Sequence, residues 1–159
     1  MQLLIALDNS PLTKRITDFL KEFLDQLSEV PTLSFIHVID NRFIGAVMGY
    51  PDIVMSYDLI DRTTETEETL FSQIREDGYK TRGDIQKQLG VTGTIDFPLN
   101  DPVLALAEAC QQKKPDLLVM GTHSRKGINH FLFGNFAEKV LRHINVPLII
   151  IPEKGMYTI

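Results

Sequence analysis

Short apolar runs alternate along this chain with longer segments in which apolar residues recur at every third or fourth position. A run of about four to seven residues is too short for a helix and predicts a strand, whereas the longer spacing predicts helices with one buried face. One segment, residues 91–97, alternates between apolar and small or polar residues, which is typical of a strand at a sheet edge. The predicted strands are residues 3–7, 33–39, 91–97, 117–120 and 148–151.

Helices are predicted between these strands. Two of them have a clear start, because Ser10 precedes Pro11 and Asp101 precedes Pro102, the order of a helix cap followed by proline at the first helical position. Successive units of strand, helix and strand indicate right-handed crossovers and therefore a parallel sheet. The predicted helices are residues 11 to about 27, about 57 to 90, 102 to about 113 and about 135 to 143.

The composition is that of a single globular domain. With 159 residues and 43% hydrophobic content, the chain suits one domain, residues 1–159. Its one cysteine, Cys110, lies on the inward stripe of its helix and cannot form an internal disulfide, which fits a reducing cytoplasm. No apolar run reaches the ~20 residues of a membrane span. The net charge of −5, with scattered Lys and Arg, argues against binding to nucleic acid or anionic membranes.

Few residues are arranged for catalysis. The four histidines follow no metal-ligand spacing, and the chain has no P-loop, dinucleotide fingerprint, nucleophile elbow or adenylation loop. The adjacent His123 and Ser124 do not form a nucleophile and its base, because neighbouring loop residues normally point apart. The sequence therefore favours binding over turnover, and no catalytic residue is assigned.

The polar segment after residues 117–120 is the strongest candidate for a binding site. Gly121 ends the predicted strand, a helical pattern resumes at Phe136, and the residues between them include glycines, hydroxyls and the cations Arg125 and Lys126. A loop between a buried strand and a helix start directs backbone N–H groups and the positive end of the helix toward one point. We therefore expect an anion there. For the two cations, a solvated surface pair is the alternative.

The spacing of this segment resembles the C-terminal signature of the universal stress protein family, Gly-x2-Gly-x9-Gly-Ser/Thr, whose loop wraps the phosphates of bound ATP. Gly121 and Gly134 match its first and third glycines. Ser124 stands in place of the second glycine, and Asn135 in place of the final Ser or Thr. Three further segments also resemble the family, namely residues 5–8, 37–40 and 137–143.

The resemblance implies a fold. This is a doubly wound, five-stranded parallel sheet of order 3-2-1-4-5 with helices on both faces, like that of the adenine nucleotide alpha-hydrolases. Such sheets bind ligands where the strand order reverses, here between the first and fourth strands, so that Asp8 and Gly121 would face each other across one crevice. The last strand, residues 148–151, would lie at a sheet edge and pair with its own copy in a homodimer.

The resemblance also implies ATP as the ligand, with any Mg²⁺ held mainly by phosphates and water. Asp8 would accept hydrogen bonds from the ribose, and the alternative is an aspartate that only caps its own turn. Val38 and Met120 would line the adenine pocket or simply belong to the core. The implied nucleotide-binding residues are Ala6, Leu7, Asp8, Val38, Met120, Gly121, His123, Ser124, Arg125, Gly134, Asn135 and Phe136.

Three functions are compatible with these residues. The first is an ATP-binding regulatory dimer of the stress response, with an unidentified protein partner. The second is a nucleotide-free dimerisation and interaction module, which the replacements at Ser124 and Asn135 favour. The third is an enzyme with slow ATPase activity and no identified base. A long apolar loop at residues 41–56 would cover either the adenine side of the pocket or a partner chain.

Overall fold

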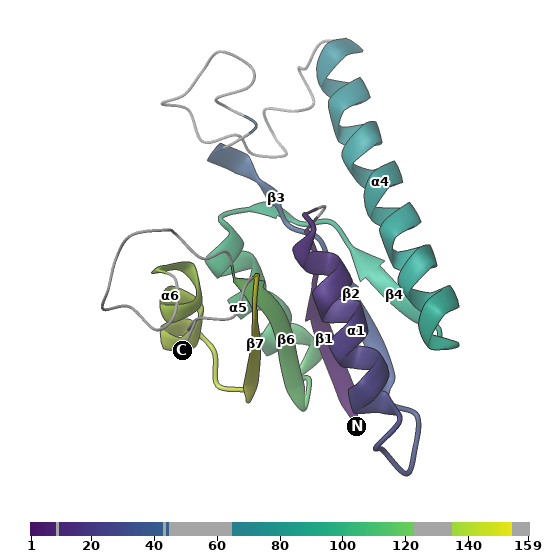
Figure 1. Ribbon diagram of the computed structural model, residues 1–159. Helices are drawn as coiled ribbons and strands as arrows, with labels where there is room; N and C mark the ends of the chain where they lie inside the picture. The colour runs from purple at the N-terminus through teal and green to yellow at the C-terminus, as the bar shows by residue number, and fades with distance from the viewer. Residues whose placement is uncertain (9, 43, 45–64, 123–134, 154–159) are drawn as a thin grey trace, which may run out of the picture.

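The computed structural model describes residues 1–8, 10–42, 44, 65–122 and 135–153, with the backbone alone for residues 65–68. Its centre is a five-stranded sheet of order β4-β2-β1-β6-β7 in which all paired strands are parallel (Figure 1). Counted along the chain within this sheet, the order is 3-2-1-4-5, as predicted. The strands are β1 (Gln2–Ala6), β2 (Thr32–Ile36), β4 (Gly93–Asp96), β6 (Leu117–Thr122) and β7 (Leu148–Pro152).

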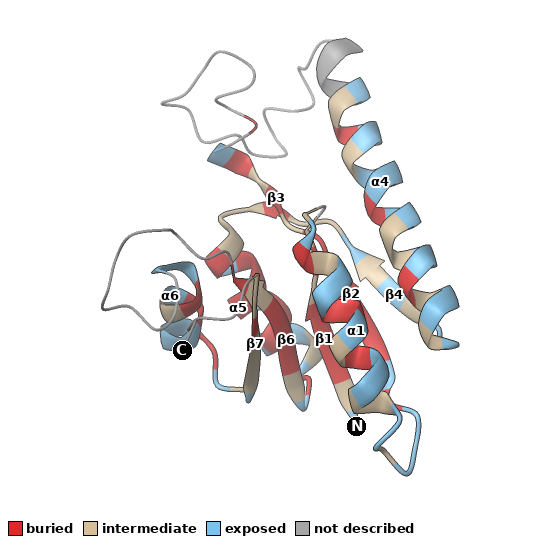
Figure 2. Cartoon of the chain, viewed as in Figure 1, coloured by how far each residue is buried: buried red, intermediate tan, exposed pale blue. Residues whose placement is uncertain are grey.

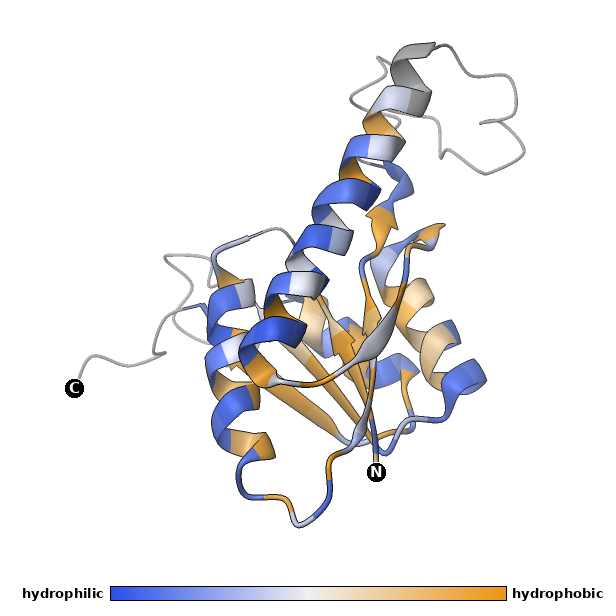
Figure 3. Ribbon diagram, turned by 90° about the vertical axis from the view of Figure 1, so that its right-hand side faces the viewer, coloured by the Kyte–Doolittle hydropathy of each residue, from blue (hydrophilic) through white to orange (hydrophobic). Residues whose placement is uncertain are grey.

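Helices cover both faces of the sheet. α1 (Leu12–Leu24) and α4 (Glu65–Leu89) pack on one face, and α5 (Pro102–Lys113) and α6 (Asn135–His143) pack on the other (Figure 1). Figure 3 shows strands that are largely hydrophobic and an α4 that is largely hydrophilic. This arrangement confirms the doubly wound fold, in which parallel strands are buried from both sides.

The core consists of two apolar clusters, one on each face of the sheet. Alternate residues of β1 separate between them, since Leu3 and Ile5 pack with α1 whereas Leu4 packs with α5 and α6. All three side chains are fully buried, and Figure 2 shows β1 as a mostly buried strand. Cys110 of α5 belongs to the second cluster, as predicted, and burial raises the pKa of its thiol to about 11, so it is an unreactive core residue.

Several element ends differ from the prediction. α1 is shorter at both ends than residues 11–27, and Pro11 stands at its cap position, although the Ser10 hydroxyl does accept a hydrogen bond from the Leu12 N–H at 3.2 Å. β6 continues two residues beyond Met120, because its last two residues pair with the end of β7. The predicted start of α4, residues 57–64, lies outside the described residues.

A second small sheet was not predicted. β3 (Ile39–Asp40) pairs in parallel with β5 (Leu99–Asn100), beyond the ends of β2 and β4. It forms where the chain leaves the main sheet after β2, so residues 33–39 are two separate strands and not one. Its apolar side packs against Phe71 of α4 and against Ile44, which is fully buried. Residues 41, 42 and 44, predicted as the start of the 41–56 loop, are helical. The rest of that loop lies outside the described residues.

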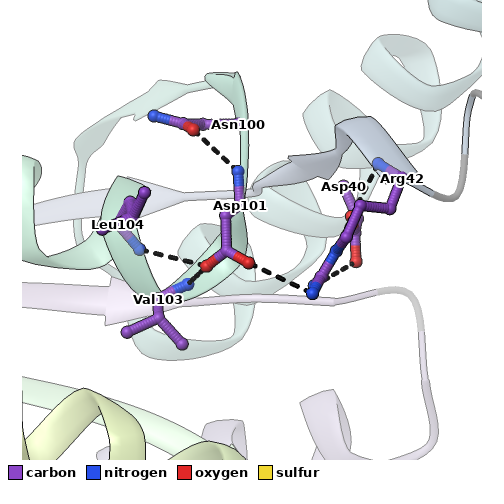
Figure 4. A network of polar contacts seen from close by, with 6 residues as sticks. All are labelled: Asp40, Arg42, Asn100, Asp101, Val103 and Leu104. Atoms are coloured by element: carbon purple, nitrogen blue, oxygen red, sulfur yellow. Dashed lines mark hydrogen bonds and ion pairs between the residues drawn. The ribbon is translucent and has the colours of Figure 1, made fainter. Parts of the chain in front are cut away.

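An ion-pair network fixes the small sheet to the start of α5 (Figure 4). Arg42 forms a two-point ion pair with Asp40, at 3.1 and 3.0 Å, and its third nitrogen reaches Asp101 at 3.2 Å. Asp101 also caps α5, because its Oδ1 accepts hydrogen bonds from the N–H groups of Val103 and Leu104 at 2.9 and 3.3 Å. The predicted cap followed by proline is therefore present at this helix.

We expect the Asp101→Ala variant to lose about 1 to 2 kcal/mol of unfolding free energy in urea titrations, because it leaves two N–H groups of α5 without their cap. Asp18→Ala is the matched control, since it breaks an exposed ion pair with Lys14 and should cost no more than about 0.5 kcal/mol. Equal losses in the two variants would show that the cap contributes nothing beyond a surface charge.

Candidate functional site

The tips of β1 and β6 meet at one edge of the sheet. Leu3 pairs with Leu117 and Ile5 with Val119. Continuing this register by two residues brings Leu7 level with Gly121, and Asp8 follows directly. Asp8 and Gly121, where the two polar turns chosen from the sequence begin, therefore lie close together at the carboxyl ends of neighbouring strands, where doubly wound sheets bind their ligands.

Asp8 holds the turn between β1 and α1. Its Oδ1 accepts hydrogen bonds from the Ser10 N–H at 3.1 Å and from the Ser10 hydroxyl at 2.6 Å, and the Thr13 hydroxyl donates to the Asp8 carbonyl. The carboxylate is partly buried. The turn-capping role is therefore real, and a contact with ribose stays a prediction. Ser10 and Thr13 were not assigned to the site from the sequence, although a serine two residues after an aspartate is a known signal of such turns.

Gly121 has a packing role that the sequence did not reveal. A Cβ at this position would lie 2.2 Å from a methyl carbon of Leu12 and 2.5 Å from its Cγ. Leu12 is only 2% exposed, so its side chain could make way for a Cβ only by disturbing the packed core around it. Glycine is therefore required here for the first turn of α1 to pack on β6, whatever the loop after it binds.

The remaining strand-end residues differ in burial. Leu7 is 6% exposed and packs with α1, and Met120 is 1% exposed and packs with α5 and α6. Ala6 and Val38 are partly buried against the same cluster as Met120. The side chains of Leu7 and Met120 are thus core residues, whereas Ala6 and Val38 stand closer to the surface of this edge.

The predicted phosphate loop is described only at its two ends. His123, Ser124, Arg125 and Gly134 lie outside the described residues. After the gap, Asn135 and Phe136 form the exposed first turn of α6, so an anion placed there would meet the positive end of that helix.

Before the gap, Thr122 is 8% exposed, and its carbonyl accepts a hydrogen bond from the Glu153 N–H at 3.0 Å. This contact ties the end of β6 to the end of β7 at the start of the loop. The sequence analysis had not singled out Thr122, whose signal would have been a hydroxyl beside the first glycine.

His37 is a second residue at this edge that sequence reasoning left aside. It follows β2 directly, is 8% exposed, and its ring centroid lies 5.9 Å from that of Phe97. Its Nδ1 is buried and has no hydrogen-bond partner. Burial lowers the pKa of His37, although the charges of Asp8 and Asp77 act in the opposite direction. A neutral imidazole therefore stands close to the Asp8 turn at neutral pH.

Asp8 also borders a hollow of about 290 Å³ on the other side of the turn. It lies between α1 and α4, with Thr13 and Lys14 on one wall and Thr81 and Asp84 on the other. No residue of β6 lines this hollow. A ligand of Asp8 could therefore lie in the hollow or between the tips of β1 and β6.

Neither a metal cluster nor a membrane helix is found in the part of the chain that the structure describes. No three His, Cys, Asp or Glu side chains gather there as they would around an ion. The described helices are also too short or too polar to cross a bilayer.

Comparison with known proteins decides the family. The sequence model of the universal stress protein family matches residues 1–152. The chain belongs to this family. Among curated members it is 22% identical over 126 residues to universal stress protein MJ0577 of Methanocaldococcus jannaschii, with 76% of each chain covered. To MJ0531 of the same organism it is 26% identical over 89 residues, which span about half of both chains, 54% of this one and 52% of MJ0531.

Solved structures of family members share the fold. MJ0577 superposes with a TM-score of 0.70 at 20% identity, covering 97% of this chain and 96% of its own. A family member from Arabidopsis thaliana, solved with AMP bound, gives a TM-score of 0.59 at 13% identity, with 98% and 93% covered. A universal stress protein in complex with cAMP gives 0.57 at 20% identity, with 97% and 98% covered. At these identities the likeness establishes the fold alone.

The Gly121→Ala variant should lose about 1 to 3 kcal/mol of unfolding free energy, because the new methyl group would overlap Leu12. Gly83→Ala, inside α4, is the matched control with the opposite sign: nothing lies within 4 Å of its Cβ position, so the variant should gain about 0.5 to 1 kcal/mol. Chemical denaturation measures both. If both variants gained a similar amount of unfolding free energy, the packing of Leu12 would not require glycine at position 121.

His37 should make the stability depend on pH. Since its pKa in the folded protein lies below the ordinary value of 6.5, the unfolded chain binds the proton first as the pH falls. The stability is fully present above about pH 6.5 and decreases as the pH drops from there toward the lowered pKa. His37→Gln should remove this part of the slope in urea titrations between about pH 7.5 and 5.5, whereas His143→Gln, at an exposed site, should keep it. Parallel slopes for wild type and His37→Gln would contradict this.

Proposed function

We propose that this member of the family binds an adenine nucleotide, with ATP as the first candidate, between the tips of β1 and β6. In this proposal it acts as a dimeric regulatory protein of the stress response. The observation that carries the proposal is the meeting of the Asp8 turn and Gly121 at one sheet edge, where the segment that leads to α6 begins. Family members solved with AMP and with cAMP support the ligand class. A reducing cytoplasm is the compartment we propose, since the single cysteine is buried and cannot form an internal disulfide.

Each part of the nucleotide has a proposed partner. The Asp8 carboxylate accepts hydrogen bonds from ribose hydroxyls, while Ala6 and Val38 border the adenine together with main-chain atoms of Leu7 and Met120. The phosphates lie against the loop from Gly121 to the start of α6, where backbone N–H groups and the helix end favour negative charge. The loop residues proposed for this contact are His123, Ser124, Arg125, Gly134, Asn135 and Phe136. Any Mg²⁺ comes with the phosphates.

A nucleotide-free interaction module is the second candidate. The Oδ1 of Asp8 already accepts two hydrogen bonds within the turn, so one of the proposed ligand contacts has a role in the fold. Ser124 and Asn135 also replace residues of the family signature. Under this alternative the chain keeps the scaffold and its dimer surface and binds protein partners without nucleotide. An ATPase would need a general base near the γ-phosphate, and we assign none.

Calorimetric titration with ATP, with and without Mg²⁺, separates the two candidates. We expect saturable binding of ATP by the wild type and a loss of about tenfold or more in Asp8→Asn, because hydrogen bonds to a charged carboxylate contribute about 1.5 to 3 kcal/mol. Asparagine keeps an oxygen acceptor for the Ser10 N–H, so the turn survives. Ser10→Ala is the control, which removes a turn contact without removing the carboxylate and should bind ATP nearly as well as wild type. No heat of binding at millimolar ATP would favour the nucleotide-free module.

The homodimer is proposed to form through β7, which lies at the edge of the sheet. In the parallel ladder the Leu118 N–H donates a hydrogen bond to the Pro147 carbonyl. Because peptide groups alternate along a strand, those of residues 147, 149 and 151 face β6, and the N–H of Ile150 points outward. Ile150→Pro should therefore leave the ladder to β6 intact and convert the dimer to a monomer, whereas Ile150→Val should not. Light scattering reports the mass, expected at twice the 18.0 kDa of one chain for wild type. A monomeric wild type would contradict this proposal.

A further inference from the structure

The edge of the sheet opposite β7 carries a hollow that has no part in the proposed nucleotide site. It measures about 660 Å³ and lies against β4, between α4 and α5. Figure 3 faces this edge and shows β4 between the two helices. Its floor is the end of β4 and the residues just after it, from Ile95 to Pro98. Its α5 wall combines the small Ala105 and Ala109 with the longer Glu108, Gln112 and Lys113.

β4 has an unpaired side at this hollow. It is the last strand of the main sheet, and within the described ranges it pairs with β2 alone. The His37 N–H donates to the Asp96 carbonyl, so Thr94 and Asp96 turn their peptide groups toward β2, and the N–H and C=O of Ile95 point to the open edge. At the other end of β4, the side-chain amide of Gln86 donates to the Gly93 carbonyl at 2.8 Å. α4 therefore covers the start of the edge and leaves the half beside the hollow open.

The α4 wall carries one aromatic and one cationic side chain. Tyr79 is 49% exposed, and its ring meets the Phe97 ring edge-on at 4.9 Å. Gly78 makes room for this wall, because a Cβ there would lie 2.3 Å from the Phe97 ring. Arg75 lies one helical turn earlier, on the same face as Tyr79. The aromatic surface is thus fixed in place.

Among the described residues, some charged side chains around the hollow have a polar partner, and one has no ion pair. Lys113 is paired with Asp96 at 2.7 Å, and Glu108 accepts a hydrogen bond from the Asn100 amide at 3.4 Å. Arg75 makes no ion pair with any residue in the described ranges. A ligand of this hollow should therefore bring a negative charge to the α4 wall.

We propose that this edge binds an extended peptide segment of a partner protein, which adds to β4 as a strand and presents an acidic and an aromatic side chain to α4. Such additions combine main-chain hydrogen bonds to an open edge with pockets for alternate side chains. Arg75 and Tyr79 are four residues apart on a helix, a rise of about 6 Å, and alternate residues of a strand are about 6.6 Å apart. Two side chains on the same side of the added strand therefore match the two wall residues.

The probes are two acetylated and amidated hexapeptides, each with an aspartate and a tyrosine two positions apart and valines at the neighbouring positions. One has aspartate first and the other tyrosine first, because a strand can add in either direction. A third and fourth peptide carry lysine in place of aspartate. Binding is followed on the backbone amide NMR signals of β4, without nucleotide, so the result is independent of the nucleotide proposal.

We expect saturable shifts of the Ile95 and Phe97 amides with at least one aspartate peptide. The Arg75→Glu variant should bind that peptide about tenfold or more weakly than wild type does, and it should bind the corresponding lysine peptide more tightly than wild type does. Ile95→Pro removes the outward N–H without touching the ladder to β2 and should abolish binding, while Ile95→Val should retain it. Lys14→Glu, a charge reversal on α1, is the control for general electrostatics and should change little.

Three results would overturn the proposal. The first is the absence of saturable shifts at β4 with either aspartate peptide up to millimolar concentration. The second is equal binding of an aspartate peptide to wild type and Arg75→Glu, a comparison that stands even if Ile95→Pro fails to fold. The third is a wild-type dimer that Ile95→Pro disrupts and Ile150→Pro does not, since the β4 edge would then be occupied by a second copy of the chain.

Discussion

The structure depends on the parallel ladder that β1 makes with β2 on one side and β6 on the other. β1 is only five residues long, and its Leu3, Leu4 and Ile5 are fully buried between the two helical layers. Because β1 is central, its register fixes where both neighbouring strands end. The strand tips are therefore positioned by burial of apolar side chains, and local hydrogen bonds, such as those between Asp8 and Ser10, then hold the first polar groups that follow them.

This constraint explains why fold and site use the same residues. Asp8 is held by the turn that starts α1, and Gly121 is required by the packing of Leu12 on β6. His37 is buried one strand away with an unpartnered Nδ1, a cost that the surrounding packing must offset. These described residues are therefore held by the packing and hydrogen bonds of the fold. A ligand that contacts Asp8 would meet a side chain already in place, which lowers the conformational entropy lost on binding.

Much of the fold was predictable because it follows from local apolar pattern, whereas the parts that depend on distant contacts were not. The strands of the main sheet and the start of α5 are each marked by a few adjacent residues. The order of the strands came from the family resemblance. β3 and β5 have two residues each and are stabilised by Ile44 and Phe71, which no local pattern connects. Likewise, Gly121 was assigned to a phosphate loop from its spacing, and only the three-dimensional packing shows that Leu12 also requires it. For Asp8, the sequence offered ribose binding and turn capping, and the structure shows the second without testing the first.

A crystal structure of the protein grown with ATP tests the central claim most directly. We predict electron density for the nucleotide between the tips of β1 and β6, with the ribose within hydrogen-bonding distance of Asp8 and the phosphates at the first turn of α6. Density for ATP in the hollow between α1 and α4, beside Thr81 and Asp84, or a vacant edge at saturating ATP, would contradict the account.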